Sequence, residues 1–308
     1  MNSRLALDGR AVGVMVLLCL IWSLQQISLK AAAAHVSPML MIGMRSAIAA
    51  VLVAALMRLR GQTLSPSPGN WRAGLVVGSL FALEFLLVAQ AVRDTYAAHV
   101  VVFLYTAPVF AALGLHWKLP EERLHWLQWA GIGIAFAGIA TAFFGSPAQS
   151  GALDTRHVLL GDFFALLAGA AWGATTVTVR CSRLSSAAPT ETLLYQLVGA
   201  GGVLLVAAPL LGEARFDASP TAWAHLAFQT VVVSFASFLA WFWLLRRYLA
   251  SRLGVFSFMT PVFGVVLGVL LLAEPLEPGF VAGALLVVAG ILLVSGARGL
   301  LQVLSVIR

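Results

Sequence analysis

Apolar residues gather in long runs along the chain, and each run is bounded by charged residues, proline or glycine. The runs cover residues of about 11–33, 38–57, 73–92, 95–115, 125–145, 159–180, 190–211, 221–245, 252–273 and 279–297. A helix that crosses a bilayer needs roughly 20 mostly apolar residues. The pattern therefore predicts an all-α, polytopic membrane protein with ten transmembrane helices.

The composition supports this reading. Of 308 residues, 61% are hydrophobic and 10% are charged, whereas about a quarter of the residues of a soluble domain are charged. Ten spans use about 200 residues, so only short connections are left and no separate soluble domain fits.

The basic residues alternate between the predicted connections. Lys and Arg accumulate on the cytoplasmic side of short loops, and with the N-terminus inside, one face collects most of them: Arg4, Arg10, Arg58, Arg60, Arg72, Lys118, Arg123, Arg180, Arg183, Arg246, Arg247, Arg252, Arg298 and Arg308. The other face holds Lys30, Arg93, Arg156 and Arg215, and Arg45 lies within a span. The net charge of +7 is thus a topology signal that faces anionic lipid. It places both termini in the cytoplasm and argues against a nucleic-acid partner.

The two halves of the chain resemble each other at a spacing near 150 residues. Trp22 and Lys30 match Trp172 and Arg180 at an offset of 150, and the segment 107–110 matches 260–263 at an offset of 153. Such drift is typical of a duplication with small loop insertions. The repeats are predicted to cover residues 1–150 and 151–308, with five transmembrane helices each.

A repeat with an odd number of spans inserts its second copy upside down. Inverted-topology repeats are characteristic of secondary transporters, which bind their substrate near the midplane where the halves meet. The architecture therefore indicates alternating access. A channel and a helical-bundle membrane enzyme are the alternatives from other classes.

The paired proline helices also carry a family resemblance. Pro108 and Pro261 are each followed by an acidic residue, Glu121 or Glu274, and by a span rich in Ala and Gly. This pattern resembles the EamA repeat of the drug/metabolite transporter superfamily, and the resemblance covers essentially the whole chain. It departs from the usual repeat at Leu119, where a glycine is expected before the acid.

The resemblance implies a multi-pass protein of the bacterial cell inner membrane that exports small organic metabolites. Within the superfamily, the chain is similar to bacterial amino-acid exporters of the YddG type, on account of Trp22, Ser23, an aromatic-rich second half and the chain length. Export of amino acids, aromatic ones included, is the expected function. A drug or nucleotide-sugar carrier on the same scaffold is the alternative, although the near absence of buried cations disfavours phosphate-bearing substrates.

Polar and aromatic side chains inside the spans are the candidates for substrate binding, because they are costly in lipid and tend to face the bundle interior. Residues three and four apart share a helix face, which groups several of them into stripes. The candidates are Trp22, Gln25, Gln26, Glu84, His99, Tyr105, Trp172, Thr175, Thr176, Ser237 and Trp241. The amides and hydroxyls among them could equally serve as contacts between helices.

Glu84 is the acidic residue deepest in a span of the first half, and it needs a partner or a function. One reading is a structural ion pair with Arg45. The other is a proton carrier, or a counter-charge for a substrate ammonium group. Asp162 and Glu191, by contrast, are expected at helix N-termini, where negative charge is favourable.

The remaining expectations concern gating and chemistry. Pro108 and Pro261 remove backbone hydrogen bonds and permit kinks, so they are candidate gating positions. Cys19 and Cys181 form no CxxC pair, and neither a metal-binding motif nor an enzymatic motif is present. We therefore expect no cofactor, no metal and no enzymatic activity. The expected partners are a small-molecule substrate, the lipid bilayer and possible coupling protons, for a monomer or a homodimer.

Overall fold

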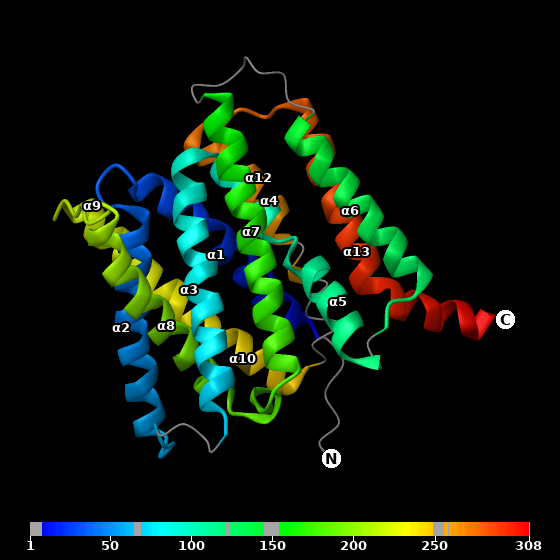
Figure 1. The fold of residues 1–308 in the computed structure, drawn as a ribbon, viewed down its shortest axis with the longest axis horizontal. Helices are drawn as coiled ribbons and strands as arrows, with labels where there is room; N and C mark the ends of the chain where they lie inside the picture. The colour runs from blue at the N-terminus through cyan, green and yellow to red at the C-terminus, as the bar shows by residue number, and fades with distance from the viewer. Residues whose placement is uncertain are drawn as a thin grey trace.

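The computed structural model describes residues 8–64, 69–120, 123–144, 154–248, 256–257 and 259–307, and these residues are mostly helical (Figure 1). Seven segments are long and apolar enough to cross a membrane: 9–32, 38–59, 71–94, 97–118, 155–180, 189–210 and 220–241. Three shorter apolar helices cover 126–142, 259–272 and 278–294. A helix thus occupies each of the ten predicted runs, and the all-α polytopic fold is confirmed.

The helices of the first half are α1 (Gly9–Ala32), α2 (Pro38–Leu59), α3 (Trp71–Asp94), α4 (Ala97–Leu104), α5 (Ala107–Lys118) and α6 (Trp126–Phe144). Those of the second half are α7 (Thr155–Arg180), η2 (Arg183–Ser186), α8 (Pro189–Leu210), α9 (Pro220–Ala227), η3 (Phe228–Ser237), α10 (Phe238–Arg247), α12 (Met259–Leu272) and α13 (Pro278–Ile307). Within the described residues, extended pairing is limited to one isolated bridge, between Val36 and Phe216.

Helices α2 and α8 show the duplication at the level of local structure. Each has 22 residues and begins with a proline in its first turn. Each is followed by a glycine with a positive φ, 67° at Gly61 and 72° at Gly212. Only glycine adopts this left-handed conformation at little cost, and it commonly follows a helix end. The same residues therefore start and stop the same helix in both halves.

Three long helix pairs organise the bundle. Helix α2 lies along α8, α3 lies along α7, and α6 lies along α13 as a pair at one side (Figure 1). The α6–α13 contact is made through glycines: a Cβ atom on Gly138 would lie 2.6 Å from Val287 N, and one on Gly290 would lie 2.5 Å from Ala135 N. Small residues let the two backbones approach closely, as is usual for helix pairs in membranes.

Two of the membrane-crossing segments are irregular. One is interrupted at Tyr105 and Thr106, between α4 and α5. In the other, η3 is a ten-residue π-helix inserted between α9 and α10. Such departures from α-helical geometry are frequent at functional sites. Both interruptions face the interior of the bundle, because Tyr105, Gln229 and Ser237 are buried.

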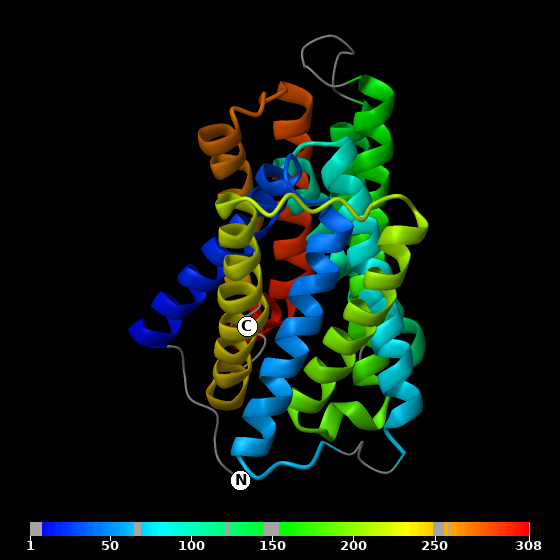
Figure 2. The same ribbon diagram turned by 90° about the vertical axis from the view of Figure 1, so that its left-hand side faces the viewer.

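The connections that follow α1 and α8 hold the two halves together at one end of the bundle. Ser37 N donates to Arg215 O at 3.0 Å, and Asp217 N donates to His35 O at 2.8 Å. Figure 2 shows the segment before α9 crossing beside the turn between α1 and α2. The repeats therefore share backbone hydrogen bonds as well as side-chain packing.

Candidate functional site

Aromatic side chains of the two halves meet beside α1. Trp22 Nε1 donates to Ser237 Oγ at 3.0 Å, and the Trp22 ring packs edge-on against Trp241 with centroids 5.7 Å apart. Ser23, the next residue, places its hydroxyl 2.7 Å from Thr260 O on α12. The predicted residues Trp22, Ser237 and Trp241 are thus brought together, at the junction between the repeats.

A chain of polar contacts crosses the interior from α1 to α2. Gln229 on η3 donates through Nε2 to Gln25 O at 2.8 Å, and its Oε1 accepts a hydrogen bond from Arg45 Nη1. The guanidinium of Arg45 also lies over the ring of Phe85, 4.6 Å from its centroid. Gln26, the residue after Gln25 on α1, is also buried. Its Oε1 has no hydrogen-bond partner within the described residues. The amides therefore serve partly as interhelical contacts.

Glu84 and Arg45 are both buried, with 4% and 1% of their surfaces exposed. The two side chains form no ion pair within 4.0 Å in the described structure. A direct ion pair with Arg45, one of the two readings of Glu84 from the sequence, is therefore absent from the described structure. Arg45 uses Gln229 and Phe85 instead, and Glu84 Oε2 has no partner among the described residues.

On the side of the bundle formed by α7, Tyr105 packs edge-on against Trp172, with ring centroids 5.2 Å apart. Thr175 and Thr176 bond to carbonyl oxygens of their own helix, Ala171 O at 3.0 Å and Trp172 O at 3.2 Å. Each of these hydroxyl groups has thus used its one donor within its own helix. Trp22 and Trp241 form one aromatic wall, and Tyr105 and Trp172 form a second aromatic wall. The hydroxyl groups of the two threonines donate their hydrogen bonds within α7.

His99 belongs to a separate buried cluster. Its Nδ1 lies 3.0 Å from both carboxylate oxygens of Asp162, and Thr95 Oγ1 donates to the same carboxylate at 2.5 Å. Phe280 stacks on the imidazole at 3.7 Å. The predicted position of Asp162 at a helix N-terminus is wrong, because α7 begins at Thr155 and Asp162 lies two turns further on. Glu191, in the first turn of α8, is where it was expected.

Glu274 and Lys30 lie at the ends of helices next to this cluster. The carboxylate of Glu274 accepts hydrogen bonds from Ala97 N at 2.6 Å and Ala98 N at 3.0 Å, where an anion stabilises the start of α4. Lys30 Nζ donates to Val92 O and Thr95 O at 2.6 and 2.7 Å. Glu121, the repeat mate of Glu274, lies outside the described residues.

Of the two prolines proposed as gating positions, Pro261 lies in α12, which begins next to a residue outside the described ranges, whereas Pro108 stands in the first turn of α5. At this position a missing N–H group leaves no helical hydrogen bond unmade. Pro108 therefore follows an interruption at Tyr105 and Thr106 and does not kink a continuous helix. Their role in gating stays a proposal.

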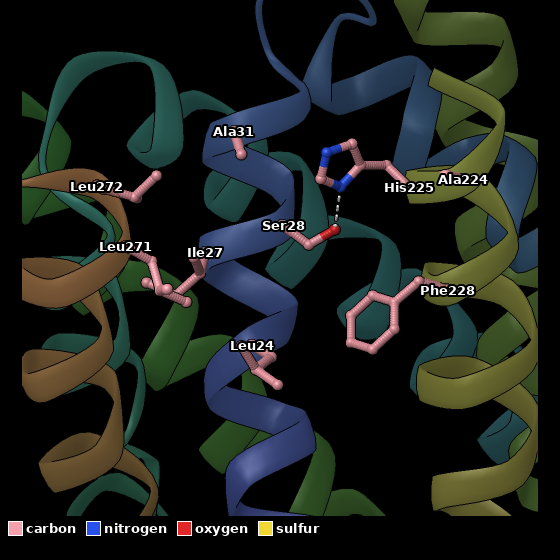
Figure 3. A pocket seen from close by; sticks show the side chains of 9 residues that line it. All are labelled: Leu24, Ile27, Ser28, Ala31, Ala224, His225, Phe228, Leu271 and Leu272. Atoms are coloured by element: carbon pink, nitrogen blue, oxygen red, sulfur yellow. Dashed lines mark hydrogen bonds between the residues drawn. The ribbon is translucent and has the colours of Figure 1, made fainter. Parts of the chain in front are cut away.

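An apolar cavity of about 410 Å³ opens between α9 and α12 (Figure 3). Its floor is one face of α1, and its one polar contact is the 2.9 Å hydrogen bond between Ser28 Oγ and His225 Nδ1. Leu24, Ile27 and Ser28 line it at three- and four-residue steps, whereas Trp22 and Gln26 lie on the other side of the same helix. None of the predicted binding residues lines this cavity.

Sequence reasoning missed several residues of these clusters. Gln229 carries a signal that could have found it, because it is an amide inside an apolar run. The pairing of Asp162 with His99 carries no such signal, since 63 residues separate them. Within the described ranges, no group of three or more His, Cys, Asp or Glu side chains could hold a metal ion.

Comparison with known proteins identifies the repeat. The profile of the EamA-like transporter family matches residues 9–144 and again residues 159–296. The two matches together cover most of the chain.

Full-length relatives share about a quarter of their residues with this chain. "Uncharacterized transporter YoaV" of Bacillus subtilis is 23% identical over 88% of this chain and 92% of its own length. "Uncharacterized inner membrane transporter YedA" of Escherichia coli is 24% identical over 86% and 84%. "Probable amino-acid metabolite efflux pump" of Salmonella typhimurium is 23% identical over 90% and 91%.

A solved crystal structure shares the fold. It superposes with a TM-score of 0.64 at 20% sequence identity, covering 92% of this chain and 95% of the other. At this identity the likeness concerns the fold alone.

Proposed function

The chain belongs to the EamA-like transporter family, and on this premise we propose that it exports amino acids, aromatic ones included, as a secondary transporter that works by alternating access. It is a multi-pass membrane protein whose two repeats each match the family. The finer proposal concerns the cargo, the direction of transport and the mechanism.

The observation that carries the proposal is the contact between Trp22 of the first repeat and Ser237 and Trp241 of the second. Secondary transporters built from inverted repeats bind substrate where the repeats meet. Indole rings beside hydroxyl and amide groups suit a solute with an apolar side chain and a polar backbone. The relative named as an amino-acid metabolite efflux pump supports the same class of cargo.

The location and coupling follow as parts of the proposal. We place the protein in the bacterial inner membrane with both termini in the cytoplasm, in line with the basic residues of the connections. Proton coupling would be measured as accumulation of substrate driven by a pH gradient. A monomer and a homodimer would be distinguished by the mass of the purified protein in detergent.

Counterflow in proteoliposomes tests the cargo. Vesicles are loaded with unlabelled amino acids, nucleotide sugars or cationic dyes at equal pH on both sides, and uptake of the labelled compound is followed. We expect saturable exchange of amino acids, because a carrier that alternates access swaps one bound solute for another.

Three other outcomes would contradict the proposal. Exchange of nucleotide sugars or dyes in place of amino acids would keep the fold and replace the cargo. Flux that rises linearly with concentration would indicate a channel. Chemical conversion of a solute by the purified protein in detergent would indicate an enzyme.

A further inference from the structure

Helices α2 and α3 each bury one ionisable side chain in the interior of the bundle. Arg45 is 1% exposed and Glu84 is 4% exposed. A charged side chain inside a bilayer is costly even on insertion scales, so both side chains call for compensation. No ion pair joins them within 4.0 Å in the described structure.

The hydrogen-bonding capacity of both groups is unfilled. A guanidinium has five N–H donors, and Arg45 contacts the Gln229 oxygen through Nη1, while its Nε has no partner among the described residues. Glu84 Oε2 likewise has none. Burying a polar atom without a hydrogen bond is unfavourable. A ligand that filled these positions would therefore gain from both of them.

The side chains around Arg45 and Glu84 are aromatic and polar, and they come from both repeats. The Phe85 ring lies 4.6 Å from the Arg45 guanidinium carbon, and Glu84 interacts electrostatically with Tyr105. Tyr105 in turn packs on Trp172. Gln229 joins Arg45 to the backbone of α1 at Gln25. Both repeats thus contribute side chains to the surroundings of Arg45 and Glu84.

We propose that Arg45 binds the carboxylate and Glu84 the ammonium group of a zwitterionic α-amino acid. The inference rests on the proposed function, since it specifies how that cargo is recognised. A planar guanidinium matches a carboxylate in two parallel hydrogen bonds. A carboxylate accepts hydrogen bonds from an ammonium group. The guanidinium of Arg45 and the carboxylate of Glu84 are therefore complementary to the carboxylate and the ammonium group of the ligand.

A zwitterion fits this pair better than a singly charged solute. An amine alone would satisfy Glu84 and leave Arg45 buried without a counter-charge, and a carboxylic acid alone would do the reverse. A buried charge that lacks its partner is strongly unfavourable. The two residues together therefore select for a ligand that carries both charges close to each other.

The first test uses the unmodified protein and three related solutes. Counterflow of labelled phenylalanine is inhibited with phenylalanine, with phenylalanine amide, which lacks the carboxylate, and with 3-phenylpropionate, which lacks the ammonium group. Hydrogen bonds to charged groups contribute enough that removal of either charge should weaken inhibition about tenfold or more. Equal inhibition by all three compounds would overturn the inference and leave amino-acid transport in place.

Two substitutions assign each charge to its residue. Glu84→Gln should bring 3-phenylpropionate and phenylalanine closer in affinity, and Arg45→Gln should do the same for phenylalanine amide. Each variant should leave the other discrimination in place. Ser28→Ala serves as the matched control, because Ser28 lines the apolar cavity on the other side of α1. It should not alter either ratio.

Two further outcomes would overturn the assignment of Arg45 and Glu84 to the two charges of the ligand. If Glu84→Gln keeps the selectivity of counterflow and loses only accumulation driven by a pH gradient, Glu84 is a proton carrier and the inference is wrong. If the unmodified protein exchanges no amino acid, the inference and the proposed function both fail. Should either variant fail to fold, the three inhibitors on the unmodified protein still give the answer.

Discussion

Trp22 joins the two halves through its ring and through its indole N–H group. Replacing Trp22 by Ala removes both the contact with Trp241 and the hydrogen bond to Ser237. An aromatic contact contributes about 0.5–1.5 kcal/mol beyond burial, so loss of such a contact between Trp22 and an aromatic substrate should raise the KM of counterflow several-fold. Trp172→Ala, on the second aromatic wall, should also raise it.

Ser237→Ala is the control for this prediction. It removes the hydrogen bond and keeps the indole ring, so its effect on KM should be smaller than that of Trp22→Ala. Unchanged kinetics in both tryptophan variants would place these rings outside the binding site.

Asp8 ties the start of α1 to the end of α10, outside the membrane-spanning segments. Its carboxylate accepts hydrogen bonds from Ala11 N at 2.8 Å and from Tyr248 Oη at 3.0 Å. The hydrogen bond from the Ala11 N–H group lowers the pKa of Asp8 below its ordinary value of 3.8. A carboxylate with a lowered pKa stabilises the fold above its ordinary pKa, and this contribution is lost as the pH falls through the lowered value.

The prediction for Asp8 is therefore a loss of thermal stability in acid. The unfolding temperature in detergent should fall for the unmodified protein as the pH decreases below 3.8. Asp8→Asn keeps an oxygen that caps the helix and removes the titration, so the difference between the two proteins should shrink in that range. A difference independent of pH would contradict this role.

At the level of elements, the α6–α13 pair depends on its glycines. A Cβ atom on Gly138 would lie 2.6 Å from Val287 N and 2.7 Å from Gly283 O, both backbone atoms that cannot move aside easily. Overpacking of this kind typically costs about 1–3 kcal/mol. We expect Gly138→Val to lower the unfolding temperature measured in detergent.

Gly133 on the same helix gives the matched control. A Cβ atom at Gly133 would meet nothing within 4 Å, and Gly133→Val brings the same β-branched side chain into the same helix. Equal effects of the two substitutions would show that helix propensity, rather than the contact with α13, controls the stability.

The elements differ in how far the sequence could predict them. The predicted ranges of α2 and α8 agree with the structure within a few residues, because proline at the start and glycine after the end are local signals. The interruption at Tyr105 and the π-helix η3 could not be predicted from the apolar runs around them. Hydropathy reports the length of a span, whereas the local helix type depends on the packing of its neighbours.

At the scale of the whole molecule, the orientation in the membrane can be tested with the native cysteines. Cys181 is exposed at the end of α7 and Cys19 is buried in α1. The basic residues Arg180 and Arg183 beside Cys181 predict that it lies on the cytoplasmic side. A membrane-impermeant maleimide should therefore label the protein in inside-out vesicles and spare it in cells with an intact inner membrane.

Cys181→Ser should abolish this labelling, which would show that Cys19 does not react. Labelling of intact cells through Cys181 would reverse the proposed topology, with both termini then on the opposite side.

The sequence by itself determined which segments are helical, how many apolar runs the chain has, and that its two halves resemble each other. In lipid the backbone groups of a span must be satisfied without water, and a helix satisfies them within its own segment, so an apolar run of about 20 residues favours a helix. The tertiary structure alone decided which buried polar groups meet: Arg45 with Gln229, and His99 with Asp162. Such pairs depend on the rotation and depth of helices that are distant in sequence, and these are set by packing between the helices.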